Sequence, residues 1–118
     1  FKAIRPQTRA EANGAWRRYS RVRHGQSPEL LVDAHRVEQY GGTGEVGDWG
    51  LAKSLAAKGL IILAGGLTPD NVGAAIAQVG PWGVDVASGV ESRPGIKDPD
   101  MLSAFVRAVR ISERDTMQ

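Results

Sequence analysis

The sequence of 118 residues predicts an α/β fold with a parallel sheet. Four short apolar segments alternate with four segments whose apolar residues recur at helical spacing, which is the pattern of repeated β-α units. The apolar segments are continuous, as is typical of parallel strands buried on both faces of a sheet. A doubly wound sheet and a β/α barrel both fit this pattern. No GxGxxG motif occurs, so nothing in the sequence supports a dinucleotide-binding fold.

The first predicted unit is a strand over residues 1–4 followed by a helix. Thr8 and Glu11 have the spacing of a capping box, which satisfies free amides at the start of a helix. We interpret the arginine-rich end of this helix as a solvated face, because the net charge is only +2 and no nucleic-acid-binding motif occurs. This stretch contains Trp16, Arg17, Arg18, Tyr19, Arg21 and Arg23.

The second predicted unit begins with a strand over residues 30–32 that ends at Asp33. A polar, glycine-rich loop over residues 34–47 follows, and Asp48 can cap the helix that comes next. The run Gly41-Gly42-Thr43-Gly44 in this loop is either a flexible lid or a long surface loop. As a phosphate cradle it is a weak signal, because no P-loop lysine follows it.

The third and fourth predicted strands both stop at glycines. Residues 60–64 form an apolar run that ends at Gly65-Gly66, and residues 84–87 form another that ends at Ser88-Gly89-Val90. Glycine lets the backbone turn sharply and brings its N–H close to an anion. In a (β/α)₈ barrel the loops after strands seven and eight often form a phosphate site. The two junctions therefore indicate the last two units of such a barrel.

Two helix starts support these units. Thr68-Pro69 and Asp98-Pro99 each place a capping side chain before a proline at the first helical position. The segment from Ser112 is polar, and we expect residues 112–118 to form a frayed tail. The chain is about half as long as the roughly 250 residues of a complete barrel, so we expect only the back end of one.

Two aspartates fall in the predicted strands at the edge where α/β folds bind their ligands. Asp33 closes an apolar strand, where partial burial favours the neutral acid and suits a general acid. A local turn cap is the alternative. Asp85 lies within the fourth predicted strand and would point into the barrel mouth or into a structural hydrogen-bond network.

The chain contains no cysteine, which excludes disulfides, thiolate metal sites and a cysteine nucleophile within it. His24 and His35 have no partner at metal-ligand spacing, so no metal site is predicted. No apolar run approaches the roughly 20 residues that span a bilayer, and no signal-peptide pattern opens the chain. We therefore expect a cytoplasmic protein that binds neither membrane nor nucleic acid.

Four segments carry a resemblance to a known family: LLVDAH, QYGGTGEVGDW, LAGGLTPDNV and GVDVASGVESRPGIKD. In this order and spacing they closely resemble phosphoribosylanthranilate isomerase of tryptophan biosynthesis, from about Lys2 to Arg110. The resemblance implies that residues 1–111 are the C-terminal half of a (β/α)₈ TIM barrel, strands five to eight with their helices. Residues 112–118 would follow as a polar tail.

The family converts phosphoribosylanthranilate to carboxyphenylamino-deoxyribulose phosphate by an Amadori rearrangement. A general acid opens the ribose ring and a general base then removes the C2 proton. No cofactor is expected, and the full-length enzyme would be a monomer or a homodimer. The implied site residues are Asp33 as the acid, Asp85 and Gly42 as substrate contacts, and Gly65, Gly66, Ser88, Gly89 and Val90 as the phosphate site.

The family's base is a cysteine at the end of strand one, and an arginine from the front half helps to hold the substrate. Neither region is matched in this chain, so we expect the chain alone to be inactive. One alternative is another phosphate-binding barrel, such as the histidine-pathway sugar isomerase or indole-glycerol-phosphate synthase, although the GGTG…DW segment argues against both. The other is a non-catalytic half-barrel that binds phosphate or self-associates.

Overall fold

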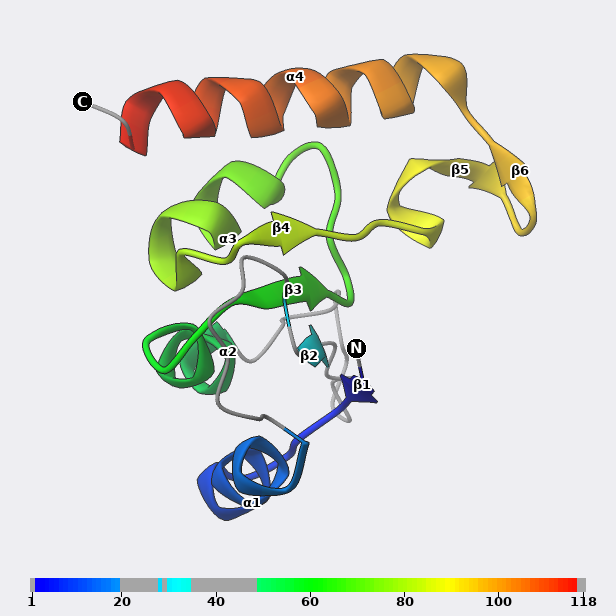
Figure 1. Ribbon diagram of the computed structural model, residues 1–118. Coiled ribbons are helices and arrows are strands. Elements are labelled where there is room, and N and C mark those ends of the chain that lie inside the picture. Colours follow the sequence, from blue (N-terminus) through cyan, green and yellow to red (C-terminus); the bar gives the residue numbers. More distant parts are fainter. Residues whose placement is uncertain (1, 20–27, 29, 35–48, 117–118) are drawn as a thin grey trace, which may run out of the picture.

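The computed structural model describes residues 2–19, 28, 30–34 and 49–116 (Figure 1). Four parallel strands form its main sheet in the order β1-β2-β3-β4, so neighbours in sequence are neighbours in space. Leu30 pairs with Lys2 on one side and with Ile61 on the other. The strands are β1 (Lys2–Ile4), β2 (Leu30–Asp33), β3 (Ile61–Ala64) and β4 (Gly83–Val84).

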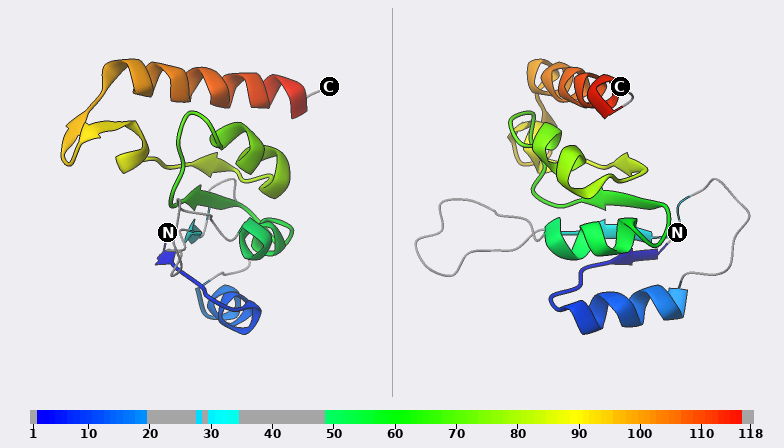
Figure 2. Two further views of the ribbon diagram at one scale, coloured as in Figure 1. Left: turned by 180° about the vertical axis from the view of Figure 1, so that it is seen from behind. Right: turned by 90° about the vertical axis from the view of Figure 1, so that its left-hand side faces the viewer.

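The helices α1, α2 and α3 lie on one face of this sheet, and α4 packs along α3 (Figures 1 and 2). A doubly wound sheet carries helices on both faces, whereas sequential strands with helices on one face form the wall of a barrel. The arrangement therefore decides between the two folds that the sequence pattern left open. The helices are α1 (Arg9–Tyr19), α2 (Trp49–Ala56), α3 (Val72–Val79) and α4 (Pro99–Thr116).

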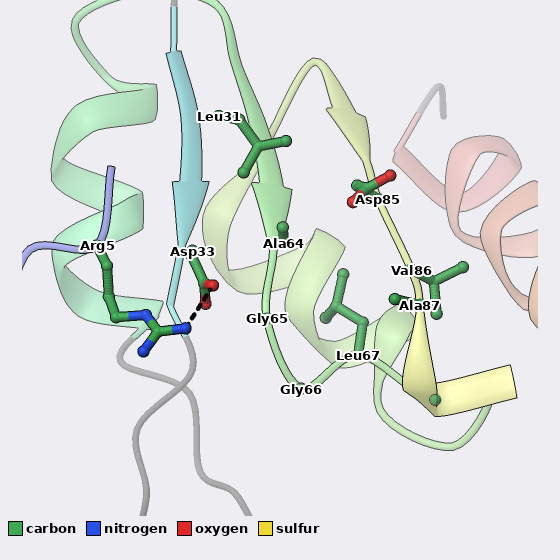
Figure 3. Close-up of a pocket in the computed structure, with 11 residues that line it drawn as sticks. Arg5, Leu31, Asp33, Ala64, Gly65, Gly66, Leu67, Asp85, Val86 and Ala87 are labelled. Atoms are coloured by element: carbon green, nitrogen blue, oxygen red, sulfur yellow. Dashed lines mark hydrogen bonds and ion pairs between the residues drawn. The ribbon is translucent and has the colours of Figure 1, made fainter. Parts of the chain in front are cut away.

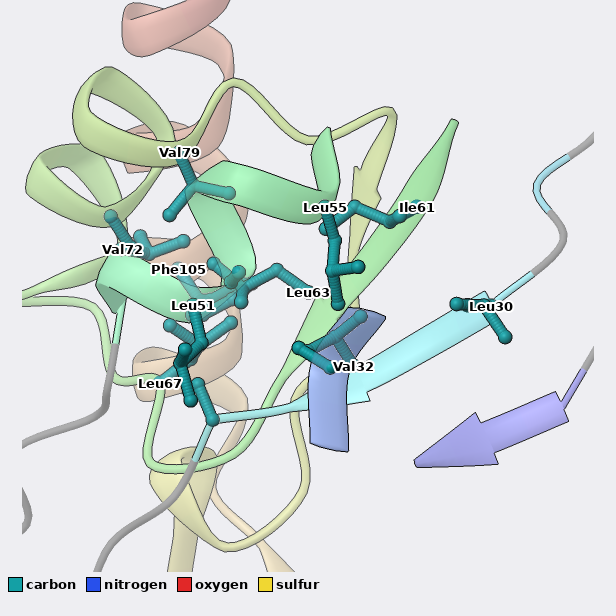
Figure 4. Packing of buried hydrophobic residues seen from close by; sticks show 14 of the residues in the cluster. Leu30, Val32, Leu51, Leu55, Ile61, Leu63, Leu67, Val72, Val79 and Phe105 are labelled. Atoms are coloured by element: carbon teal, nitrogen blue, oxygen red, sulfur yellow. The ribbon is translucent and has the colours of Figure 1, made fainter. Parts of the chain in front are cut away.

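The core fills the space between the sheet and these helices (Figure 4). Alternate strand residues point into it and are fully buried: Leu30, Val32, Ile61 and Leu63. The residues between them, Leu31 and Ile62, are only half-buried, because successive side chains of a strand point to opposite faces. The continuous apolar runs predicted that the strands are buried on both faces of the sheet. Among the described residues, burial is complete only on the face that the helices cover.

The predicted capping residues open two of the helices. Thr8 Oγ1 accepts a hydrogen bond from the N–H of Glu11 at 3.1 Å, and Glu11 Oε1 accepts one from the N–H of Gln7 at 2.8 Å. Asp98 Oδ1 accepts from the N–H groups of Asp100 and Met101, which begins α4. The helix starts predicted at Thr8 and at Asp98 are confirmed.

Three element boundaries differ from the prediction by more than one residue. The fourth strand was expected over residues 84–87, but β4 ends at Val84 and the chain turns into the 3₁₀ helix η1 (Ser88–Val90). The helix predicted from Pro69 begins at Val72, after a turn that Thr68 stabilises through its carbonyl. The expectation of a frayed tail from Ser112 was wrong for residues 112–116, because α4 continues to Thr116.

A short hairpin between η1 and α4 was not predicted. It consists of β5 (Glu91–Arg93) and β6 (Ile96–Lys97), which pair antiparallel. Its strands are short and mostly exposed, so no apolar periodicity marks them. The signal that could have found it is the Pro94-Gly95 turn, where Gly95 has φ 83°. No helix in the described part of the chain is long and apolar enough to cross a membrane.

Candidate functional site

A pocket of about 310 Å³ opens at the carboxyl ends of the parallel strands (Figure 3). In α/β folds this edge binds the ligand, because the loops that follow the strands all meet there. The pocket draws residues from Arg5, directly after β1, to Gly89 in η1, segments that lie far apart in the sequence. Its lining residues are Arg5, Leu31, Asp33, Ala64, Gly65, Gly66, Leu67, Asp85, Val86, Ala87 and Gly89.

The acidic wall of the pocket is built around Asp33, the last residue of β2. The Nη2 atom of Arg5 lies 3.1 Å from Asp33 Oδ2 and donates a hydrogen bond to it (Figure 3). The Asp33 side chain is 28% exposed and that of Arg5 is 59% exposed, so the pair sits at the pocket mouth. Asp33 therefore occupies the predicted position, held by a cation from the neighbouring strand end.

Arg5 was not singled out from the sequence. It directly follows β1, and β1 pairs with β2 in parallel register, so its side chain emerges at the same edge as that of Asp33. The signal that could have found Arg5 was its place directly after an apolar strand, at the same strand end as Asp33 and Gly65.

The first glycine loop follows β3. Gly65 and Gly66 have φ of 94° and 71°, which non-glycine residues rarely adopt. Asn71 supports the loop from behind: its Nδ2 donates to the Gly66 carbonyl at 2.9 Å, and its Oδ1 accepts from the Thr68 N–H at 2.8 Å. Because the C=O and N–H of a trans peptide point in opposite directions, the Leu67 N–H is directed away from Asn71.

The second loop follows β4. Asp85 lies one residue past the strand, is exposed, and still donates its N–H to the Leu63 carbonyl at 2.8 Å. Asp85 lines the pocket (Figure 3). This position fits the alternative in which its side chain points into a barrel mouth, and its role stays a prediction. Gly89 lines the same pocket and lies so close to the first loop that a β-carbon on it would overlap the Leu67 carbonyl.

The hairpin holds both ends of η1. Lys97 Nζ donates to the Ala87 carbonyl at 3.0 Å, and the Asp98 N–H donates to the Val90 carbonyl at 2.7 Å. Lys97 Nζ also lies 3.0 Å from Glu91 Oε2. This hydrogen bond from Lys97 is the main reason that the pKa of Glu91 is lowered below its ordinary value of 4.5; the Gly95 N–H adds to the effect and partial burial opposes it.

The structure brings together five of the predicted site residues as pocket lining: Asp33, Asp85, Gly65, Gly66 and Gly89. Val90 was also predicted as a phosphate-site residue, but it does not line this pocket. It is 1% exposed within the core, and its N–H donates to the Ala87 carbonyl at 3.4 Å. Ser88 contributes backbone in η1 beside Gly89. Gly42 lies outside the described residues.

The pocket therefore has two chemically different sides. One carries carboxylates and a guanidinium, which suit proton transfer and contacts to polar groups. The other is backbone from two glycine loops, of which one opens into η1, and backbone N–H groups in such loops favour an anion. Within the described residues no cluster of three or more histidine, cysteine or acidic side chains could hold a metal ion.

Parallel strands in sequential order, helices on one face and a pocket at the carboxyl ends define a protein of the β/α-barrel class. A model of the N-(5'-phosphoribosyl)anthranilate (PRA) isomerase family matches residues 2–108, and the chain belongs to this family.

Similar proteins agree with this membership. The N-(5'-phosphoribosyl)anthranilate isomerase of Roseiflexus castenholzii is 54% identical over 86 residues, which cover 73% of this chain and 40% of that protein. The crystal structure of phosphoribosyl anthranilate isomerase from Thermotoga maritima matches with a TM-score of 0.71 and 33% identity, over 92% of this chain and 49% of that one. The chain thus spans half or less of the length of these relatives.

A third similar structure was solved with a bound ligand. It is a phosphoribosyl anthranilate isomerase in complex with reduced 1-(o-carboxyphenylamino)-1-deoxyribulose 5-phosphate, and it matches with a TM-score of 0.68 and 29% identity. The match covers 92% of this chain and 46% of that one.

Proposed function

We propose that this chain is the C-terminal half, strands five to eight, of a phosphoribosylanthranilate isomerase barrel. It would supply the general acid and the phosphate site for the conversion of phosphoribosylanthranilate to carboxyphenylamino-deoxyribulose phosphate in tryptophan biosynthesis. Membership of the family and four sequential β-α units support this assignment. The match to about half of the Thermotoga chain supports the extent of the half-barrel.

Asp33 is the proposed general acid. It would protonate the ring oxygen of the aminoribose, so that the ring opens to a Schiff base. A base must then remove the C2 proton, and the enolamine that forms tautomerises to the ketone. Asp33 lies at the end of β2 in the pocket, held by Arg5, where a positioned acid can reach a bound substrate. Asp85 on the neighbouring wall is a proposed substrate contact.

This mechanism also needs a general base. The chain contains no cysteine, so it does not supply the cysteine base that the resemblance implies. A complementary half-barrel carrying the base would complete the site. The chain by itself is therefore proposed to bind substrate weakly and not to turn it over.

The phosphate group is proposed to bind between the two glycine loops, through the N–H groups of Gly65, Gly66, Ser88 and Gly89. The observation that supports this proposal is the backbone contact between the loops at Gly89 and Leu67, which sets the two loops side by side at the pocket. Side-chain donors hold the Gly66 and Ala87 carbonyls, so the N–H groups of Leu67 and Ser88 are directed away from those donors. Of these two residues, Ser88 belongs to the proposed phosphate site.

A titration with inorganic phosphate tests this site. Amide resonances of Gly65, Gly66, Ser88 and Gly89 in ¹⁵N-labelled protein should shift together and saturate. The Gly66→Val variant should lose the response, since a β-branched side chain is strained at positive φ and obstructs the anion. Saturable shifts confined to another region, with these four amides unmoved, would count against the assignment.

A second candidate function is a non-catalytic half-barrel that associates with a copy of itself. The observation that favours it is the half-buried apolar face of the sheet at Leu31 and Ile62, opposite the helices. The edge strands β1 and β4 have one partner each among the described strands, and open edges promote pairing with another chain. Oligomeric state and activity together separate this candidate from the first.

A further inference from the structure

We propose that Lys97 is a positioning residue for the anion-binding loop. Its ammonium group holds the Ala87 carbonyl, and this orients the N–H of Ser88 toward the place between the two glycine loops where a phosphate group would lie. The identity of the anion rests on the proposed function. The hold that Lys97 has on the loop rests on geometry alone and is tested separately below.

Lys97 makes two contacts from the end of the hairpin. Its Nζ lies 3.0 Å from the Ala87 carbonyl oxygen and 3.0 Å from Glu91 Oε2. Glu91 is itself held, since its Oε1 accepts from the Gly95 N–H at 3.4 Å and its side chain is 17% exposed. The ammonium group is therefore fixed between a carboxylate and a backbone carbonyl, which are separated by η1.

The contact to Ala87 sets the direction of a whole peptide group. The C=O of Ala87 and the N–H of Ser88 belong to one planar unit, and in a trans peptide they point in opposite directions. No cis peptide bond occurs among the described residues. When Lys97 holds the carbonyl on the hairpin side, the Ser88 N–H is fixed on the other side.

The first glycine loop is built in the same way. Asn71 holds the Gly66 carbonyl, so the Leu67 N–H is directed away from Asn71. Gly89 brings the two loops into backbone contact beside these peptide groups. Two loops from different β-α units thus each have one carbonyl held by a side-chain donor, and Lys97 is the donor for the second loop.

A purely structural role for Lys97 would be to close the hairpin. The backbone already does this, because β5 pairs with β6 and the Asp98 N–H donates to the Val90 carbonyl at 2.7 Å. The Lys97 side chain is 51% exposed, and exposed ion pairs contribute little to stability. Loss of the ammonium group is therefore expected to affect the loop more than the fold.

The test measures the dissociation constant for inorganic phosphate by amide shifts of the 118-residue chain. Lys97→Met keeps the aliphatic stem and removes the donor, and binding should weaken about tenfold, the value of a lost hydrogen bond to a charged group. Lys97→Arg keeps a cationic donor and should recover most of the affinity. Lys58→Met is the matched control, since it removes the same charge from a lysine that donates to Asn13 between α1 and α2.

A double variant separates positioning from simple attraction of the anion by charge. Lys97→Met combined with Glu91→Gln has the same net charge as the unmodified chain. If Lys97 acts through the Ala87 carbonyl, the double variant binds phosphate as weakly as Lys97→Met. Recovery of wild-type affinity in the double variant, or unchanged affinity in Lys97→Met, would overturn the proposal.

One readout does not depend on phosphate. In the anion-free protein the Ser88 amide resonance should shift in Lys97→Met and remain in place in Lys58→Met, with unfolding midpoints close to that of the unmodified chain. If the unmodified chain fails to bind phosphate, the proposed phosphate site is contradicted, and the Ser88 resonance still decides whether Lys97 positions the loop. An unmoved Ser88 resonance in Lys97→Met would overturn the inference whatever the chain binds.

Discussion

Gly89 lies directly against the backbone carbonyl of Leu67, with no room for a side chain between them. The two residues belong to loops that follow different strands, β3 and β4, and Leu67 is also 2% exposed in the core. The contact therefore couples the shape of the candidate anion site to the packing of the fold.

Gly89→Ala should separate the two loops. The new β-carbon would overlap the Leu67 carbonyl, which is backbone and cannot rotate away, so overpacking should destabilise the chain by about 1–3 kcal/mol. The affinity for phosphate should fall in the same variant. Urea unfolding and phosphate titration measure the two effects.

Gly14→Ala is the matched control for this substitution. Gly14 lies within α1, and a β-carbon there would meet no atom within 4 Å from the other described parts of the chain. Alanine in a helix interior should stabilise the chain by about 0.5–1 kcal/mol and leave phosphate binding unchanged. Equal effects of the two substitutions would contradict the contact between Gly89 and Leu67.

Asn71→Asp should weaken the first glycine loop. The substitution keeps the acceptor for the Thr68 N–H but replaces the donor to the Gly66 carbonyl with a carboxylate oxygen. A lost hydrogen bond and a repelled carbonyl should cost about 1–3 kcal/mol of stability and raise the dissociation constant for phosphate. Thermal unfolding and the same titration check this, with Asp70→Asn as a neighbouring control that lies on the exposed side of the turn.

The ion pair between Glu91 and Lys97 predicts a pH dependence. The pKa of Glu91 is lowered in the folded chain, mainly by the hydrogen bond from Lys97. The ionised carboxylate therefore stabilises the fold at pH values above 4.5, the ordinary pKa of the group. This small contribution should disappear as the pH falls through the lowered pKa. The unfolding midpoints of the chain and of Glu91→Gln should differ near neutrality and converge in acid. A difference that grows toward acid would have the wrong sign.

Asp33→Asn tests the proposed general acid. It requires a complete barrel, for example this chain joined to the part of the Roseiflexus castenholzii relative that it does not match. The amide cannot donate the proton in the same way, so kcat should fall by about 10²- to 10⁴-fold with a smaller effect on KM. Asp85→Asn in the same chimera should mainly raise KM, as a substrate contact would. Near-normal kcat in Asp33→Asn would remove Asp33 from the mechanism.

The chain on its own should associate or pack loosely. The half-buried face at Leu31 and Ile62 favours association with a second copy, as do the edges of β1 and β4, each of which has one partner among the described strands. Size-exclusion chromatography with light scattering should give a dimer or larger species, and a fluorescence assay should detect no loss of phosphoribosylanthranilate. A compact, cooperatively unfolding monomer that turns over substrate would contradict both the half-barrel and the need for an external base.

The sequence was sufficient at several positions where the signal is local. The capping residues Thr8 and Asp98, the strand that closes at Asp33 and the glycines after β3 all report on a few consecutive residues, and all are where they were predicted. The hairpin of β5 and β6 was missed because its strands are short, polar and exposed. The helical end of α4 was missed because a polar composition does not by itself end a helix.

By itself the sequence determined the alternation of strands and helices, the family and the residues at the strand ends, because these follow from spacing along the chain. Only the tertiary structure decided that the four strands of the main sheet run in sequential order with α1, α2 and α3 on one face. Only the structure brought Arg5 to Asp33, Asn71 to Gly66 and Lys97 to Ala87. These pairs join different strands and loops, and the register of the sheet and the path of the hairpin set their distances.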